Sequence, residues 1–250
     1  NKNYINAIKK VLHSKQLTQG PLSLEFEKQL CNYFGSKYCN VLSNGTAALF
    51  VGLKALEIKK NEIILVSPLS FVAGAMCAIF LDRSIDFVDI NLDTYSLCDI
   101  SLEKKILQLK KLKKKVGCII VTDYSGIPAN WSNLYKLKKK YKFKIINDNC
   151  HAIGSSYLST NKYAVIYSDL VVQSYHAIKN ITTAEGGSVL TNNKSLHNKI
   201  SSLKSHGISR TNSSKKKNGL WFYDVKNLGL NFRLSEIQCA LGISQLSRVK

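Results

Sequence analysis

Short apolar segments alternate with helical patterns through most of this 250-residue chain. The apolar segments have the length of strands and lie at 38–42, 62–66, 85–89, 116–122, 143–147, 170–174 and 187–191. Between them, apolar residues recur at helical spacing at 46–56, 71–81, 102–112 and 130–140. Mostly apolar strands need cover on both faces, and helices between strands permit parallel pairing. The sequence therefore predicts an α/β fold, a mostly parallel sheet with helices on both faces.

Helical patterns also flank this alternating region. They occupy 3–14 and 22–34 before it and 194–205 and 233–250 after it, with a polar loop at 211–219. The last pattern reaches the end of the chain without a stop signal, and the chain opens on Asn1. We therefore expect a fragment of a longer protein.

A lysine follows closely on one of the predicted strands. The apolar segment 169–174 ends in Ser174, and Lys179 comes five residues later. Ligands of open α/β sheets bind at the carboxyl edge of the strands. A lysine amine at that edge can form a Schiff base with a carbonyl, which is how proteins usually hold pyridoxal phosphate. The competing interpretation is a surface lysine, because the chain contains 36 lysines and arginines.

A possible phosphate site joins the first of these strands to the helix after it. Gly45 permits a tight turn there, and the amides of Thr46 and Ala47 should point outward from the first helical turn. The hydroxyl of Ser174 could donate to the same phosphate. An ordinary helix cap would have the same sequence pattern.

A carboxylate, Asp148, follows the segment 143–147. At the carboxyl edge of a sheet it can pair with a protonated pyridine nitrogen and make the ring an electron sink. His151 could bond to the phenolic oxygen of the ring, and Phe71 could lie on the ring face. A helix cap is the alternative for Asp148 and a core position the alternative for Phe71. The order of the pieces along the chain nevertheless favours a pyridoxal phosphate site.

The net charge of +20 raises the question of a nucleic-acid or membrane partner. The lysines are spread along amphipathic stretches such as 102–115 and do not gather with aromatic residues, so we predict no nucleic-acid partner. The apolar stretch 63–81 is about as long as a membrane span, but Ser67 and Pro68 divide it. It is expected to form a buried strand and then a buried helix, so no membrane partner is predicted.

Seven cysteines are scattered through the chain and never have CxxC spacing. This usage is typical of free thiols in a reducing compartment rather than of a disulfide framework or a zinc site. It predicts a cytoplasmic protein with no metal site.

Eight stretches together resemble one family. They are Leu17–Pro21, Ser43–Leu49, Pro68–Ala73, Phe87–Tyr95, Asp148–Gly154, Ser174–Gly187, Ser205–Gly207 and Leu228–Gln238. In these stretches the chain resembles the DegT family of pyridoxal-phosphate-dependent sugar-nucleotide aminotransferases, which have fold type I. Several stretches look most like the members that aminate a UDP-4-keto-6-deoxy-hexosamine in pseudaminic acid biosynthesis. The stretch 176–182 looks equally like the lipid A arabinose aminotransferase.

The resemblance implies a role for individual residues. Lys179 would be the Schiff-base lysine and proton shuttle, and Asp148 would hold the pyridine nitrogen. The remaining cofactor contacts implied are Gly45, Thr46, Ala47 and Ser174 at the phosphate, His151 near the phenolic oxygen and Phe71 on the ring. Asn231 would reach the phosphate of the other subunit of a homodimer. Lys15, Gln16, Leu17 and Thr18 match a stretch that contacts the sugar nucleotide.

The chain also departs from the family pattern. Gln173 stands where an aromatic residue is usual, and Asn149 and Cys150 replace a pair of small residues. The resemblance implies that residues 1–230 form the large cofactor-binding domain with its N-terminal helical segment. Residues 231–250 would begin the helix that leads to a small C-terminal domain, which this chain lacks.

The predicted activity is transfer of an amino group from L-glutamate to a nucleotide-linked keto sugar, giving an amino sugar for a surface polysaccharide or glycan. A sugar dehydratase on the same scaffold is one alternative, although in those relatives a His replaces the lysine found here as Lys179. A regulator that binds pyridoxal phosphate without catalysis is the other.

Overall fold

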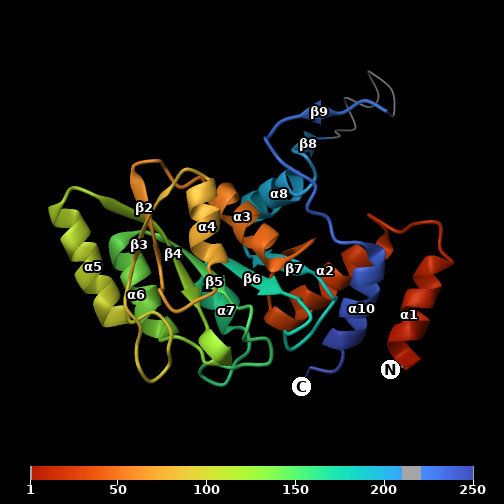
Figure 1. Cartoon of the computed structure of the whole chain (residues 1–250), viewed down its shortest axis with the longest axis horizontal. Helices are drawn as coiled ribbons and strands as arrows, with labels where there is room; N and C mark the ends of the chain where they lie inside the picture. Colours follow the sequence, from red (N-terminus) through yellow and green to blue (C-terminus); the bar gives the residue numbers. More distant parts are fainter. Residues whose placement is uncertain (1, 210–220, 250) are drawn as a thin grey trace.

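A computed structural model describes residues 2–209 and 221–249, and its centre is a seven-stranded sheet (Figure 1). The strands lie in the order β1-β7-β6-β5-β4-β2-β3. Their bounds are β1 Tyr38–Leu42, β2 Glu62–Val66, β3 Ser84–Phe87, β4 Lys115–Thr122, β5 Lys144–Asp148, β6 Leu170–Ser174 and β7 Gly187–Thr191. Pairing is parallel from β3 through β2, β4 and β5 to β6, and only β7 runs antiparallel to its two neighbours. The predicted mostly parallel sheet is confirmed.

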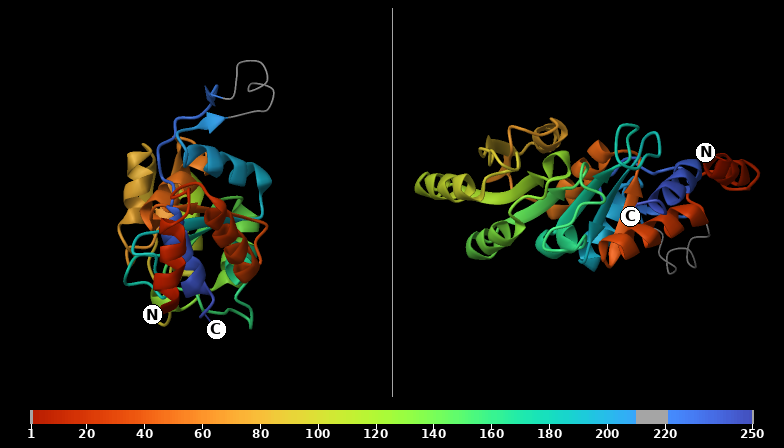
Figure 2. Two further views of the ribbon diagram at one scale, coloured as in Figure 1. Left: turned by 90° about the vertical axis from the view of Figure 1, so that its right-hand side faces the viewer. Right: turned by 90° about the horizontal axis from the view of Figure 1, so that it is seen from below.

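Helices cover both faces of the sheet, as the sequence predicted (Figure 2). Their bounds are α1 Lys2–Leu12, α2 Pro21–Phe34, α3 Gly45–Leu56, α4 Ala73–Phe80, α5 Asp99–Lys111, α6 Trp131–Tyr141, α7 Tyr163–Tyr167, α8 Lys194–Leu203 and α10 Glu236–Leu246. The five residues of α7 and the 3-10 turn η1, Tyr124–Gly126, were not predicted. Such short helices hold too few apolar residues to display a period.

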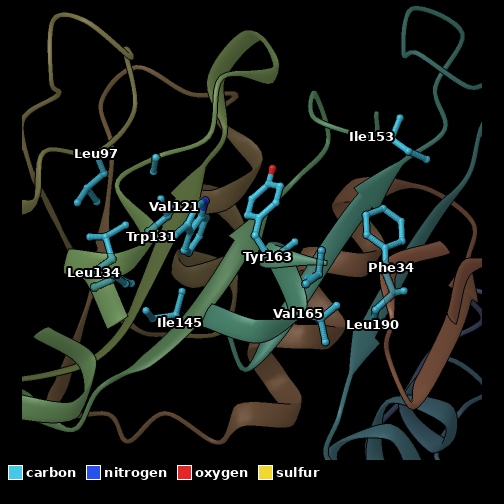
Figure 3. Close-up of a cluster of buried hydrophobic side chains, with 14 of the residues drawn as sticks. Phe34, Leu97, Val121, Trp131, Leu134, Ile145, Ile153, Tyr163, Val165 and Leu190 are labelled. Atoms are coloured by element: carbon cyan, nitrogen blue, oxygen red, sulfur yellow. The ribbon is translucent and has the colours of Figure 1, made fainter. Parts of the chain in front are cut away.

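The apolar strands divide their side chains between two cores. In β2, Ile63 and Leu65 belong to a core shared with α2, α5, α6 and α7, and Ile64 and Val66 to a second core shared with α3, α4 and α8. Successive side chains of a strand point to opposite faces, so an unbroken apolar run supplies both cores at once. Figure 3 shows part of the first core, where the rings of Trp131 and Tyr163 lie among aliphatic side chains.

The helix α10 packs between α1 and α2 at one end of the sheet (Figure 1). The sequence pattern predicted a helix over 233–250, but α10 begins at Glu236, after a cap at Ser235, and ends at Leu246. Ser235 and Gln238 form a reciprocal capping box, which fixes the start of the helix. The proposed domain boundary near residue 230 stays a prediction.

A two-stranded ribbon, β8 Ile208–Ser209 and β9 Asp224–Val225, extends from the body of the molecule beyond α8 (Figure 1). It was not predicted, because two residues per strand give no period. The polar loop predicted at 211–219 lies outside the described residues.

The long apolar stretch divides where the sequence suggested. Strand β2 ends at Val66 and helix α4 begins at Ala73, two residues later than the predicted start. In the part of the chain that the structure describes, no helix has the length and apolar character needed to cross a bilayer.

Candidate active site

A pocket of about 760 Å³ opens at the carboxyl ends of three neighbouring strands. The last residues of β4, β5 and β6, which are Thr122, Asp148 and Ser174, all line it. Its lining also includes Asn44, Gly45, Thr46, Ala47, Phe71, Met76, Cys77, Phe80, Cys150, His151, His176, Ile178, Lys179, Glu185, Leu230 and Phe232. Parallel strands bring their carboxyl ends to one edge, which explains why residues far apart in sequence meet here.

The first turn of α3 forms one wall of the pocket. Asn44 caps the helix, and its side-chain oxygen accepts a hydrogen bond from the amide of Ala47 at 2.7 Å. The amides of Gly45 and Thr46 have no partner among the described residues and remain free for an anion. The amide of Ala47 thus serves the helix cap that the sequence left open as the alternative, and a role for Ala47 at a phosphate stays a prediction.

Two glycines bring the backbone close together around this helix start. A Cβ on Gly45 would lie 2.8 Å from the Cβ of Ser174, and a Cβ on Gly187 would lie 2.4 Å from the carbonyl oxygen of Asn44. The end of β6, the start of β7 and the start of α3 therefore meet in a narrow cradle. The Ser174 hydroxyl and the two free amides of α3 border it, which is a donor set that fits a phosphate group.

Asp148 lies at the floor of the pocket, with 6% of its surface exposed. Its Oδ1 accepts a hydrogen bond from the amide of Cys150 at 3.3 Å. The thiol of Cys150 is its other side-chain partner and only a weak donor, so the carboxylate keeps acceptor capacity for a ligand. A protonated pyridine nitrogen fits that requirement.

The charged groups of Asp148 and Lys179 both act on His151. Burial lowers the pKa of His151 below its ordinary value, the ammonium of Lys179 lowers it further, and the carboxylate of Asp148 opposes the change. Its Nδ1 accepts from the amide of Ser125 at 3.4 Å, and its ring lies edge-on to Tyr124 at 5.9 Å. The Nε2 atom has no partner in the described chain. It is available to the pocket.

Lys179 is half-buried in the loop after β6. Its amide donates to the carbonyl of His176 at 2.9 Å, which turns the loop over the pocket. Its ammonium has no ion-pair partner among residues 2–209 and 221–249. By contrast, Lys138 on the far side of the sheet is paired with Asp169 at 2.8 Å. An unpaired lysine beside a pocket is available for chemistry.

The mouth of the pocket is apolar. Phe71 lines it at the approach to α4 and is 68% exposed, and Phe80 at the end of α4 is 85% exposed. Ile178 and Leu230 add further exposed apolar surface. The position of Phe71 is compatible with stacking on a ring, and the core alternative does not fit its exposure.

Two sets of predicted residues lie outside the pocket. Asn231 is exposed and its side chain accepts from the amide of Arg233 at 3.3 Å, although Leu230 and Phe232 on either side do line the pocket. The exposed segment Lys15–Thr18 contacts the start of α10 instead. The structure brings the other predicted site residues together in one pocket, and the roles of Asn231 and Lys15–Thr18 stay predictions.

Besides Asn44, the sequence analysis missed three polar residues of the pocket. Thr122 ends β4 directly beside Asp148 in the register of the sheet, and its place at a strand end was a usable signal. His176 and Glu185 face each other across the Lys179 loop, with Nε2 and Oε1 3.7 Å apart. No sequence pattern indicated that pair. In the described chain no three or more His, Cys, Asp or Glu side chains gather as a metal site.

The residues that depart from the family pattern contact one another. The amide of Gln173 donates to Oδ1 of Asn149 at 2.5 Å, and Nδ2 of Asn149 donates to Asp123 at 2.8 Å. All three are buried. One hydrogen bond therefore joins the two replacements on the face of the sheet away from the pocket. Cys150 lines the pocket, and burial raises the pKa of its thiol well above the ordinary value.

A model of the DegT/DnrJ/EryC1/StrS aminotransferase family matches residues 1–250. This chain belongs to that family. Among curated relatives, the UDP-4-amino-4,6-dideoxy-N-acetyl-beta-L-altrosamine transaminase of Campylobacter jejuni is 40% identical over 245 residues, which are 98% of this chain and 61% of that protein. The transaminase of the same name from Helicobacter pylori is 39% identical over 97% of this chain and 61% of its own length. The chain thus spans about three-fifths of these relatives.

Solved structures of the DegT/DnrJ/EryC1/StrS family have the same fold. Helicobacter pylori PseC, an aminotransferase involved in the biosynthesis of pseudoaminic acid, superposes with a TM-score of 0.88 at 34% identity, covering 100% of this chain and 63% of its own. A putative sugar aminotransferase from Streptococcus pneumoniae in its PMP form gives 0.88 at 25% identity, covering 100% and 66%. The predicted family is confirmed, and these findings indicate pyridoxal phosphate as the cofactor.

Proposed function

We propose that this protein transfers an amino group from L-glutamate to the keto group of a nucleotide-linked sugar, a UDP-4-keto-6-deoxy-hexosamine. The observation that carries the proposal is one pocket that contains an unpaired lysine, an aspartate that keeps acceptor capacity and a phosphate cradle. When bound, pyridoxal phosphate would supply an aldehyde carbon for the amino group and an electron-withdrawing ring. The product would be an amino sugar for a surface polysaccharide or glycan.

Each proposed role is supported by the place of the residue in the pocket. Lys179 would anchor the cofactor covalently, and its freed amine would move a proton between the substrate carbon that bears the amino group and the cofactor. Asp148 keeps the ring nitrogen protonated with its remaining acceptor capacity. Gly45, Thr46 and Ser174 hold the phosphate, and Ala47 shapes the same turn.

The remaining pocket residues orient the ring and limit water. His151 offers Nε2 to the phenolic oxygen, and Phe71 covers one ring face. The apolar lining of α4, which includes Met76 and Cys77, restricts water near the reacting carbons. These roles require no metal ion.

The substrate proposal draws on the relatives. Those named above are transaminases of a UDP-linked amino sugar, and one solved neighbour is involved in pseudoaminic acid biosynthesis. We assign Lys15, Gln16, Leu17 and Thr18 to binding of the nucleotide sugar. Their exposure leaves them accessible to a ligand or to a second chain.

We further propose a homodimer in which Asn231 completes the phosphate site of the other subunit. Its side chain faces solvent beside two pocket residues, Leu230 and Phe232. The exposed apolar surface at the pocket mouth, around Phe71 and Phe80, is the kind of surface that a second copy would bury. A cytoplasmic location is proposed from the seven free thiols.

The decisive experiment uses the full-length protein with pyridoxal phosphate and L-glutamate. A panel of UDP-, GDP- and dTDP-linked keto sugars is offered, and the products are identified by mass spectrometry and NMR. Formation of a 4-amino sugar from the UDP-linked substrate is expected. Consumption of sugar with loss of a hydroxyl and no amination would indicate the dehydratase, and no turnover of any sugar would favour the regulator.

The dimer has its own test. Chains carrying Lys179→Ala are mixed with chains carrying Asn231→Ala under conditions where subunits exchange. If Asn231 serves the other subunit, each mixed dimer should regain one native site, and activity should rise above that of either variant alone. Failure to complement, with exchange demonstrated, would place Asn231 outside the partner's site.

A further inference from the structure

The helix α2 receives its N-terminal cap from a residue 214 positions away in the sequence. The cap position of α2 is Gly20, which has no side chain to offer. Instead, the amides of Leu22 and Ser23 donate to the carboxylate of Glu236, at 2.7 and 3.0 Å, and the Ser23 hydroxyl donates to it at 2.8 Å. Glu236 is 1% exposed. A buried carboxylate with three donors at a helix N-terminus is strongly held in place.

The backbone of the same residue holds the segment Lys15–Thr18. The amide of Glu236 donates to the carbonyl of Leu17 at 2.9 Å, and Thr18 forms an antiparallel bridge with Ser235. The contact leaves no room for a side chain at position 20, because a Cβ on Gly20 would lie 2.6 Å from Oε2 of Glu236. The carboxyl end of the segment, Leu17 and Thr18, is therefore fastened to the start of α10.

The first turn of α10 also reaches the pocket. The side-chain amide of Gln238, oriented by its capping box with Ser235, donates to the carbonyl of Glu185 at 2.5 Å. Glu185 lines the pocket and belongs to the loop that follows Lys179. One helical turn thus contacts both the Lys15–Thr18 segment and the pocket wall.

We propose that Glu236 is a positioning residue that holds Lys15–Thr18 in register with the pocket and thereby sets the affinity for the nucleotide sugar. A serine or asparagine at position 20 would cap α2 equally well from within the helix's own segment. A carboxylate from α10 does something that a local cap cannot, because it ties the first turn of α2, and through it the segment that leads into α2, to the turn that contacts the pocket. The proposal rests on the assignment of Lys15–Thr18 to the nucleotide sugar.

The test compares full-length cofactor-loaded proteins carrying Glu236→Ala, Glu236→Gln or Gly20→Ala. Gly20→Ala attacks the same contact from the other side and keeps the carboxylate. The matched control is Asn193→Ala, because Asn193 also accepts from two helix amides, at the start of α8 and away from the pocket. Hydrogen exchange reports the order of the amides at 15–20, calorimetry with UDP reports nucleotide binding, and absorbance titration reports pyridoxal phosphate binding.

Glu236→Ala and Gly20→Ala should each speed exchange at 15–20 and weaken UDP binding about tenfold, the equivalent of one lost hydrogen bond to a charged group. Cofactor affinity and the half-reaction with L-glutamate should stay within about twofold, since no pocket group is lost. Glu236→Gln, which keeps one acceptor oxygen, should lose less UDP affinity and show slower exchange at 15–20 than Glu236→Ala. Asn193→Ala should lower stability without changing exchange at 15–20 or UDP binding.

Two results would overturn the inference. One is unchanged exchange at 15–20 in both Glu236→Ala and Gly20→Ala. The other is faster exchange with unchanged UDP affinity, which would reduce Glu236 to a structural cap. If the wild-type protein binds no UDP, the proposed substrate class is contradicted. The role proposed for Glu236 in UDP affinity is then contradicted as well. If the wild-type protein binds UDP but does not turn over L-glutamate, only the proposed activity is contradicted.

Discussion

Two aspartates at neighbouring strand ends have opposite surroundings. Asp123 directly follows β4 and is fully buried, and its carboxylate accepts hydrogen bonds from the amide of Ala129, the indole of Trp131, the amide side chain of Asn149 and the hydroxyl of Tyr163. Asp148 ends β5 and lines the pocket, and its carboxylate accepts from the amide of Cys150 and from the weakly donating Cys150 thiol. The amide of Asp123 donates to the carbonyl of Asp148 at 3.3 Å, so the two lie side by side.

The difference shows how to separate a structural carboxylate from a functional one. The four donors of Asp123 use its acceptor capacity within the protein, whereas Asp148 keeps acceptor capacity in the pocket. The two faces of the sheet differ in the same way. On the face of the sheet that carries Asp123, Trp131 and Tyr163 are buried in a core (Figure 3). On the face that carries Asp148, several side chains of α4 are exposed.

The largest effect is expected at the unpaired lysine of the pocket face. Lys179→Ala should lower turnover about 10,000-fold, because it removes both the covalent anchor and the proton shuttle. Borohydride should attach the cofactor to the Lys179 peptide in the wild type and to no peptide in the variant. The matched control is Lys138→Ala, which breaks the ion pair with Asp169 and should lower stability while turnover is kept. A trapped peptide elsewhere in Lys179→Ala would mean that another lysine is the anchor.

Asp148→Asn should give the next largest change in turnover. The variant should fold and bind cofactor, yet turn over about 100- to 1,000-fold more slowly, because the ring nitrogen loses its charged partner. The absorbance spectrum of the bound cofactor and steady-state kinetics are the measurements. Unimpaired turnover would return Asp148 to the role of a cap for the following turn.

Asp123→Asn should lower stability and leave turnover nearly unchanged. It should lower the free energy of unfolding in urea by about 3 kcal/mol, because donors that face the carboxylate lose their acceptor. Turnover per folded molecule should change little, since Asp123 does not line the pocket. A large loss of turnover with unchanged stability would show that Asp123 is a functional carboxylate and not a structural one.

The pH dependence sharpens the same comparison. Burial raises the pKa of Asp123 to about 6, and its four donors limit the rise. Because the folded protein then binds the proton more tightly than the unfolded chain, this contribution to stability is present below about pH 4 and lost as pH rises through 6. The stability gap between wild type and Asp123→Asn should therefore widen by about 3 kcal/mol from pH 7 to pH 4. If the stability difference narrows instead, the four donors lower the pKa of Asp123 more than burial raises it.

The smallest effect concerns His151, which lies between the charged groups of the pocket. Its pKa is lowered by burial and by Lys179 and raised by Asp148. The NMR-titrated pKa of His151 in the cofactor-free protein should therefore rise in Lys179→Met and fall in Asp148→Asn. The pKa of His197, which burial also lowers but which faces Glu27 and Lys204, should stay constant and serves as the internal control. Equal shifts at both histidines would point to a general loosening of the fold.

Much of the pocket could be predicted because strand ends are readable in sequence. The apolar runs that end at Asp148 and Ser174 mark two points on one sheet edge, and Gly45 marks the start of a helix above it. Lys179 follows one of those ends by five residues. Local patterns therefore locate each group, and parallel pairing brings them together.

Contacts between distant segments could not be predicted in the same way. Gln173 and Asn149 looked like two separate departures, yet one hydrogen bond joins them. A hydrogen bond depends on a few tenths of an ångström, and no periodicity in a sequence carries that information.

The sequence by itself determined the parallel sheet, its two apolar faces and the strand ends that border the pocket, because strand and helix periods follow from backbone geometry alone. Only the tertiary structure decided that Asp123 is saturated while Asp148 keeps acceptor capacity, and that Glu236 caps α2 across 214 positions. The physical reason is that a polar group's role depends on which partners remain for it once the chain is packed, and those partners come from segments far apart in the sequence.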